Sequence, residues 1–472
     1  MLYGLLVRRY STVPLSSVRF HLSRILQPYQ WSFVGYLILA GLIPKFYELS
    51  NTFWIGHISY EALAITEQYE FLAVTLEIVN ETIPFGVLAL VAQNFRNKEK
   101  VISILKSGLI VQVLFSGILM SIVVLFTPQF VSTIGTPPEI VSLTSNYLIL
   151  KSIALPFEAV ATLLLIAIKS MRKGREVLYL VLFSVILNMV LDLFLISNTS
   201  VSLNLGVEGV AIGYVISKVA LFAITSVFAV RIMNINLRFP SFSFTNVKGM
   251  LRPLFSIGGW TGLDSLVRNI GYILVPLNVL NLIGANQFGG YGLAMTVMWT
   301  AIIPVLAITE GTNVVVGNYY GERKYDDLKK VVLTSLLLVS IAMGTILVGG
   351  ALFWGNLSHF FNQNPEIVDY SVTSFWWLII PYCFFALSMV LRSIFYGTGK
   401  TKYIFIISSV LNFALIFPFW TLSKLNLVNA SFENVMALFV VVFTVDLIIT
   451  CLLVRRIMNK TKLHDPKTQL VS

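Results

Sequence analysis

The tetrapeptide Arg231-Ile-Met-Asn234 recurs as Arg456-Ile-Met-Asn459, 225 residues further along the chain. The same interval separates three further pairs of residues, Pro28 and Pro253, Pro156 and Pro381, and Gly174 and Gly399. A constant interval across nearly half the chain indicates two copies of one unit. Such internal repeats define the overall architecture, so they are considered before local sequence patterns. Duplicated apolar units are typical of secondary transporters, which hold their binding site between the two copies.

Composition places this repeat in a membrane. Of the 472 residues, 57% are apolar and 12% are charged, against about 25% charged in soluble domains. A helix needs about 20 apolar residues to cross the hydrocarbon core. We therefore expect an all-α polytopic membrane protein with twelve transmembrane helices, in two six-helix repeats related by a pseudo-two-fold axis along the membrane normal. The expected helices are 31–55, 61–95, 103–127, 140–169, 177–197, 207–232, 253–282, 290–319, 331–354, 367–395, 403–423 and 432–455.

Lysine and arginine are concentrated in every second connection between these helices. Connections after the even-numbered helices are basic, as at Arg96, Arg172 and Arg323, whereas the odd-numbered ones contain only Lys424. The positive-inside rule therefore predicts that both termini are cytoplasmic. The net charge of +11 reflects this asymmetry, and we expect no nucleic-acid partner. The expected divisions are a basic N-terminal tail (1–30), an N-lobe (31–233), a cytoplasmic linker (234–248), a C-lobe (249–458) and a cytoplasmic tail (459–472).

Nothing in the sequence suggests an enzyme, a resident cofactor or a metal site. The four histidines lie in tails or expected loops, and no glycine-rich phosphate loop or nucleophile elbow occurs. Cys383 and Cys451 lie in expected helices and form no disulfide framework. The informative residues are the ionisable ones inside the expected spans, because burying a charge in a membrane is costly and often marks an ion or substrate path.

The fifth expected helix contains Asn188 and Asp192, four residues apart and therefore on one face. A carboxylate beside an amide oxygen suits a proton or a hard cation. Aligned on the second copy, these positions are Asn412 and Ile416, so the acid is missing there. We expect the coupling chemistry in the N-terminal half alone.

Acidic residues also gather on the second expected helix. Glu70, Glu77 and Glu81 follow one another at intervals of seven and four, which places them on one helix face. Such carboxylates could carry protons or attract cations to a substrate cavity. Glu48 on the first helix is a further cavity candidate, and the alternative for it is neutralisation by Lys45.

The second half has charges of its own. Asp264 and Arg268 stand four residues apart and are expected to pair. Glu310 has no obvious local partner and is a candidate for lining the cavity. For Arg392 and Lys151 we expect snorkelling to the membrane interface.

Several motifs resemble the multidrug and toxic compound extrusion (MATE) family. They cover most of the chain between residues 30 and 455, and their order agrees with the repeat. The similar stretches are Asn188-Met-Val-Leu-Asp192 in the fifth helix, Gly206-Val-Glu-Gly209 opening the sixth, Asn51-Thr-Phe-Trp-Ile-Gly56 in the first, Gly86 to Gln93 with its second copy Gly311 to Asn318, and the loop glycines Gly174 and Gly399.

This resemblance implies an antiporter with two V-arranged lobes, which exports organic compounds and is driven by protons or sodium. Asp192 and Asn188 would form the cation-coupling pair, joined by Tyr47. The family's first-helix acid is Asn51 here, and Glu48, or Glu77 and Glu81, could substitute for it. A hydroxyl that helps in some members near the start of helix six is not evident in 209–213, which makes proton coupling the stronger expectation. We expect a monomer in the plasma membrane with cationic or amphipathic small molecules as its cargo.

Three alternatives remain open at this point. A lipid or lipid-linked oligosaccharide flippase of the same superfamily would share the architecture but usually needs a basic cavity. A major facilitator transporter usually has a Gly-x-x-x-Asp-Arg-x-Gly-Arg-type loop after helix two, where this chain has Gln93-Asn-Phe-Arg-Asn-Lys98. A receptor or structural membrane protein is disfavoured by the duplication and by the acids within the spans.

Overall fold

The computed structural model describes residues 31–56, 58, 60–133, 136, 139–197, 199–233 and 244–463. All regular structure in this part of the chain is helical. The first half forms α3 (Trp31–Gly56), α4 (Tyr60–Asn94), α5 (Lys98–Thr133), α6 (Val141–Ser152), α7 (Leu155–Ser170), α8 (Gly174–Leu195) and α9 (Gly206–Met233). The second half forms α10 (Phe244–Tyr272), the π-helix η2 (Ile273–Val279), α11 (Leu280–Ile283), α12 (Ala285–Ala301), α13 (Ile303–Gly321), α14 (Tyr325–Phe361), α15 (Pro365–Thr398), α16 (Lys402–Leu411), the π-helix η3 (Asn412–Ile416), α17 (Phe417–Lys424) and α18 (Phe432–Leu463).

Several of the expected spans are broken into consecutive helices. Pro156 stands at the start of α7, just after the break from α6, and Pro304 stands at the start of α13, whose axis lies at 49° to that of α12. Proline lacks the backbone N–H that would continue a helix, so breaks are expected beside it. Within the described residues nine helices are long and apolar enough to cross a membrane, or ten if α12 and α13 count as one span. The polytopic helical fold is therefore confirmed, while the number of twelve crossings stays a prediction.

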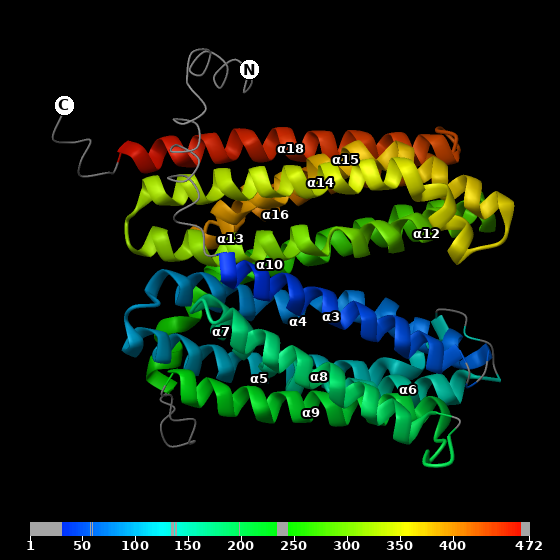
Figure 1. The fold of residues 1–472 in the computed structure, drawn as a ribbon, viewed down its shortest axis with the longest axis horizontal. Helices are drawn as coiled ribbons and strands as arrows, with labels where there is room; N and C mark the ends of the chain where they lie inside the picture. Colours follow the sequence, from blue (N-terminus) through cyan, green and yellow to red (C-terminus); the bar gives the residue numbers. More distant parts are fainter. Residues whose placement is uncertain are drawn as a thin grey trace.

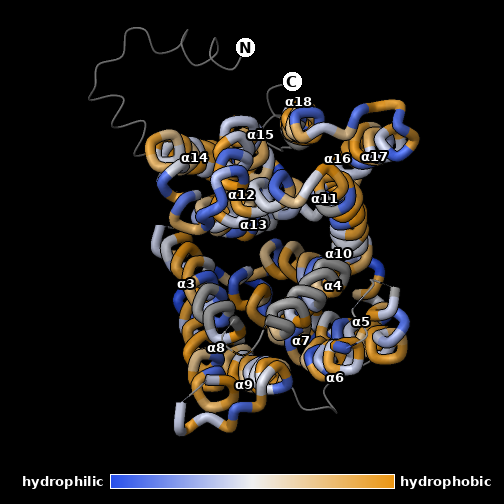
Figure 2. The backbone as a smooth tube through the Cα atoms, turned by 90° about the vertical axis from the view of Figure 1, so that its right-hand side faces the viewer, coloured by the Kyte–Doolittle hydropathy of each residue, from blue (hydrophilic) through white to orange (hydrophobic). Residues whose placement is uncertain are grey.

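The helices run side by side in two groups (Figure 1). One group contains α3 to α9 and the other contains α10 to α18, and the view along the helices separates them clearly (Figure 2). We call these groups the N-lobe and the C-lobe. They meet where α3 and α4 face α10 and α13. Buried apolar side chains such as Val87 on α4 and Leu254 on α10 belong to one hydrophobic core that is continuous across this boundary.

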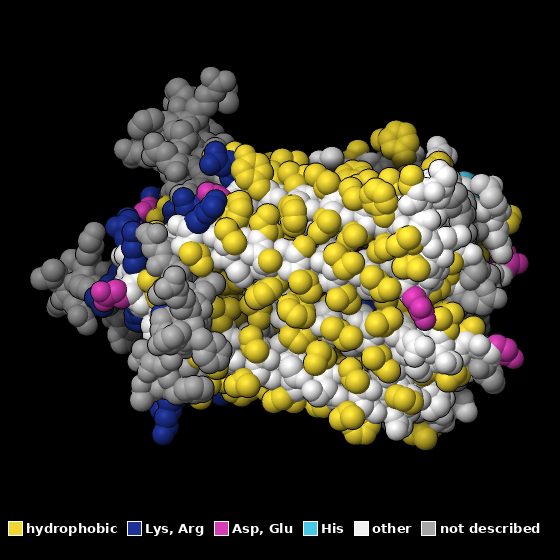
Figure 3. All heavy atoms as spheres, turned by 90° about the horizontal axis from the view of Figure 1, so that it is seen from below, with side chains coloured by type: hydrophobic (Ala, Val, Ile, Leu, Met, Phe, Trp, Pro, Cys, Tyr) yellow, Lys and Arg dark blue, Asp and Glu magenta, His cyan; other side chains and the backbone are white. Residues whose placement is uncertain are grey.

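The outer surface has the character of a membrane protein. Apolar side chains cover its flank, and lysine and arginine side chains gather at one end (Figure 3). At that end α4 turns into α5 and α13 turns into α14 (Figure 1). We call it the basic end, and it carries Arg96, Lys98, Arg323 and Lys324 among its exposed residues.

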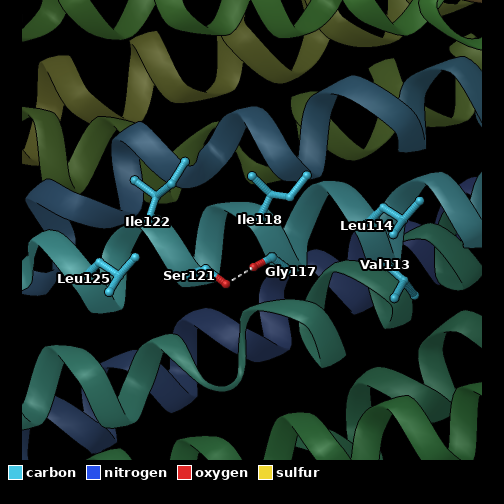
Figure 4. A pocket seen from close by; sticks show the side chains of 7 residues that line it. All are labelled: Val113, Leu114, Gly117, Ile118, Ser121, Ile122 and Leu125. Carbon is cyan, nitrogen blue, oxygen red and sulfur yellow. Dashed lines mark hydrogen bonds between the residues drawn. The ribbon is translucent and has the colours of Figure 1, made fainter.

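One shallow groove follows the outer face of α5 from Val113 to Leu125 (Figure 4). The residues that line it all come from this single helix, and its polar side chain, Ser121, is satisfied by donating to the Gly117 carbonyl at 2.9 Å. A Cβ added at Gly117 would meet nothing within 4 Å. The groove is therefore open apolar surface on the flank, and the candidate site lies elsewhere, among the ionisable residues between and within the lobes.

Candidate functional site

The packing of α8 against α3 creates a buried acidic site in the N-lobe. Asp192 on α8 is 6% exposed, and its carboxylate interacts with the Tyr47 hydroxyl on α3. Asp192 Oδ2 is buried and has no hydrogen-bond partner among the described residues. The structure thus brings together Tyr47 and Asp192, two residues that lie 145 positions apart in the sequence.

The two asparagines predicted for this site lie on the same pair of helices. Asn51 stands one turn after Tyr47 on α3, and its Oδ1 is buried without a hydrogen-bond partner in the described part of the chain. Asn188 stands one turn before Asp192 on α8 and is half-buried. Buried oxygens that lack a donor are unusual in proteins and call for a proton or an ion. The role of these four residues in cation coupling stays a prediction.

The acids of α4 have a partner that local spacing did not assign. Arg268 Nη1 lies 3.0 Å from Asp264, which confirms the expected pair, but its Nη2 lies 2.8 Å from Glu81 and 3.9 Å from Glu77. Arg268 and Asp264 are on α10 and the two glutamates are on α4, so this cluster bridges the lobes. The side chain of Glu70 lies outside the described part of the structure.

Glu48 and Glu310 each have a lysine partner. Glu48 forms an ion pair with Lys45 on the same helix, as the alternative interpretation expected. Glu310 on α13 lies 2.5 Å from Lys169 on α7, so its partner comes from the other lobe. Local sequence could not indicate this second pair, because its members are 141 residues apart.

The expected snorkelling of Arg392 and Lys151 is wrong. Arg392 on α15 forms an ion pair with Asp446 on α18, which is 3% exposed. Lys151 on α6 is 8% exposed, and its Nζ lies 3.7 Å from the centroid of the Tyr69 ring. Neighbouring helices provide an acid in one case and an aromatic ring in the other, so neither cation needs to reach the interface.

Two amide side chains join the lobes at the basic end. Gln93 Nε2 on α4 donates to the Gly397 carbonyl at 2.9 Å, and Asn318 Nδ2 on α13 donates to the Ala92 carbonyl at 2.7 Å. Asn318 Oδ1 also accepts a hydrogen bond from Arg172 Nε. We call these five residues the basic-end seal. The sequence repeat could have indicated two of these residues, because Gln93 and Asn318 are separated by the same interval of 225 residues.

Glycines allow the two lobes to approach closely. A Cβ added at Gly258 on α10 would lie 1.8 Å from the Thr82 carbonyl oxygen on α4, and one at Gly321 would lie 1.9 Å from the Gln93 carbonyl oxygen. Small residues permit such backbone contact between membrane helices. The lobes are therefore packed backbone to backbone along the basic half of their boundary, and this half of the boundary is closed.

Replacement of Asn318 by alanine is expected to loosen the seal. Asn318 is fully buried, and its loss removes its hydrogen bonds with the Ala92 carbonyl and with Arg172, which costs about 1–3 kcal/mol. In a protein whose Cys383 and Cys451 are replaced by alanine, a cysteine at the buried position Ser170 should react with a water-soluble maleimide about tenfold faster. Asn278→Ala, a change at an exposed asparagine, is the control, and equal rates in both variants would contradict the seal.

Comparison with known proteins adds a family match over both halves of the chain. The family model described as MatE matches residues 37–194 and 261–420. The Probable multidrug resistance protein YoeA of Bacillus subtilis (strain 168) is 21% identical over 318 residues, which cover 66% of this chain and 68% of that protein. The Multidrug export protein MepA of Staphylococcus haemolyticus (strain JCSC1435) is 22% identical over 350 residues, which cover 70% of this chain and 73% of that protein.

A solved structure has the same fold. The MATE transporter VcmN of Vibrio cholerae, solved as a mutant, superimposes with a TM-score of 0.82 at 15% sequence identity. The match covers 94% of this chain and 98% of that one. The arrangement of the helices is thus shared over almost the full length of both chains.

Proposed function

Because this chain belongs to the MatE family, whose model matches both of its halves, we propose that it exports organic compounds by alternating access in exchange for a cation. It is a multi-pass membrane protein. We place it in the plasma membrane, as a monomer, with the basic end and both termini on the cytoplasmic side. The relatives named for multidrug resistance and multidrug export support small organic cargo, and they do not favour the flippase alternative.

The buried carboxylate of Asp192 carries this proposal. A carboxylate at 6% exposure is expensive to keep charged inside a membrane protein, so such residues commonly serve proton or ion movement. Proton coupling is supported over sodium because the Tyr47 hydroxyl beside the carboxylate can donate a hydrogen bond, whereas a hard cation requires several oxygen ligands whose lone pairs face it.

A change of charge at Asp192 can affect the boundary between the lobes through neighbouring helices. Its partner Tyr47 is on α3, and α3 packs against α13 of the C-lobe. Protonation removes the charge that holds the Tyr47 hydroxyl, so the preferred position of α3 changes with the state of the acid. A cation can drive the conformational change only through different affinities for the two states. The basic half of the boundary between the lobes is closed in this structure. This supports its assignment to the conformation that is open away from the cytoplasm.

The direct test uses purified protein in liposomes loaded with a fluorescent cationic dye. We expect dye movement when a proton gradient is imposed and none when a sodium gradient of equal size replaces it. Movement under sodium alone would contradict proton coupling. Dye movement that no ion gradient accelerates would contradict antiport.

The proposed orientation predicts which side of the membrane each connection faces. Val201, between α8 and α9, and Asp326, at the start of α14, are both exposed. In intact cells a membrane-impermeant maleimide should label a cysteine at 201 and leave a cysteine at 326 unlabelled until the membrane is opened. The reverse pattern would contradict the orientation and the cytoplasmic placement of the basic end.

A further inference from the structure

The cluster around Arg268 is a site in which an arginine of one lobe is bound by carboxylates of the other. Arg268 Nη2 lies 2.8 Å from Glu81 Oε1 and 3.9 Å from Glu77 Oε2, both on α4. Asn269 Nδ2, from the next residue of α10, donates to Glu77 Oε2 at 3.1 Å. The acids of α4 therefore already hold a cation, and that cation is part of the same chain.

The side chains of this cluster differ in how exposed they are. The side chains of Glu77 and Arg268 are 47% and 42% exposed, that of Glu81 is 15% exposed and that of Asp264 is fully buried. The ion pair between Arg268 and the glutamates is thus partly exposed, whereas Asp264 is buried. Aromatic rings lie beside the acids, because Phe85 follows Glu81 by one turn of α4 and packs against Tyr396 of α15 with ring centroids 5.0 Å apart.

Arg268 has a second position available on its own helix. Its Nη1 already donates to Asp264 Oδ2 at 3.0 Å, one turn earlier on α10. The other oxygen, Asp264 Oδ1, is buried and has no hydrogen-bond partner among the described residues. Arginine binds a carboxylate best through two parallel N–H donors. The guanidinium can therefore leave Glu77 and Glu81 and form a two-pronged pair with Asp264.

We propose that Arg268 is a built-in competitor for cationic cargo: an organic cation binds Glu77 and Glu81 beside the Phe85 ring by displacing Arg268 onto Asp264. This inference rests on the proposed export function and names the charge class and the place of the cargo. Two carboxylates beside an aromatic face recognise a delocalised organic cation. A neutral compound cannot replace the positive charge of Arg268 at the two glutamates. Arg268 therefore restricts this site to cationic compounds.

The test measures equilibrium binding of ethidium to the purified full-length protein in detergent, without any ion gradient. Arg268→Gln removes the competitor, and ethidium should bind about tenfold more tightly. Adding Glu81→Gln to Arg268→Gln should cancel that gain, because the freed acid is lost. Arg455→Gln, at an exposed position on α18, controls for the change in net charge and should leave the affinity unchanged.

A second variant addresses the alternative position of the guanidinium. Asp264→Asn removes the acid that receives the displaced Arg268, so ethidium should bind about tenfold more weakly, with no change for an uncharged dye of similar size. If Arg268→Gln does not fold, this variant alone decides the question. Unchanged or weaker ethidium binding in folded Arg268→Gln, or unchanged binding in Asp264→Asn, would overturn the inference. Because binding is measured without a gradient, failure of coupled transport would contradict the proposed function and leave this competition measurable.

Discussion

Asp192→Asn is expected to reduce gradient-driven efflux by roughly 100-fold while leaving the protein folded. Asparagine has nearly the shape of the protonated acid, can still accept the hydrogen bond from the Tyr47 hydroxyl, and can neither ionise nor titrate. A transporter that cannot alternate between the charged and neutral states of this residue cannot be driven by the gradient. The measurement is the initial rate of dye efflux against gradient size in liposomes that contain equal amounts of protein.

Asn412→Ala is the matched control from the second copy of the repeat. Asn412 is buried like Asp192, but its Nδ2 donates to the Ser408 carbonyl of its own helix, and Ile416 stands where the acid would be. This variant should retain most of the coupled efflux. Full coupling in Asp192→Asn, or a greater loss in Asn412→Ala, would place the coupling site elsewhere, with Glu48 and Glu81 as the next candidates.

The second large effect is expected from a single methyl group at Gly258. Its Cβ would lie 1.8 Å from the Thr82 carbonyl oxygen, and backbone atoms on α4 and α10 cannot separate without opening the boundary between the lobes. Overpacking of this kind costs roughly 3 kcal/mol. Gly258→Ala should therefore lower the thermal unfolding temperature of the detergent-solubilised protein and accelerate labelling of a cysteine at Ser170.

The neighbouring Gly259 provides the control on the same helix. A Cβ there would approach no atom more closely than 3.8 Å, which is ordinary contact. Because alanine favours helix over glycine by about 1 kcal/mol, Gly259→Ala should be neutral or slightly stabilising. If the two variants have the same unfolding temperature, the backbone contact at Gly258 does not hold the lobes together.

The helices and part of the candidate site could be predicted because their signals are local. Uncharged apolar runs predict spans, and the spacing of four between Asn188 and Asp192 predicts a shared helix face. Tyr47 was expected beside Asp192 only through the family resemblance, and the structure brings the two together. Breaks at Pro156 and Pro304 have local causes as well.

The contacts between the lobes could not be predicted in the same way. Arg268 was expected to pair with Asp264, four residues away, because that partner is visible in the sequence, whereas Glu81 is 187 residues away. Lys169 and Glu310 pair over a similar separation. Long-range ion pairs depend on how two helices rotate against each other, and a single sequence does not specify that rotation.

We propose that the charge on Asp192 acts through Tyr47 and α3 on α13, which carries Asn318 of the basic-end seal. This effect of Asp192 is tested most directly by the distance between spin labels at Glu99 on α5 and Asp326 on α14, both exposed at the basic end, in a protein without Cys383 and Cys451. The distance distribution of the otherwise unmodified protein should change between neutral and acidic pH. With Asp192→Asn it should match the acidic distribution at both pH values. A distribution that responds to pH identically with and without Asp192 would show that Asp192 does not control the seal.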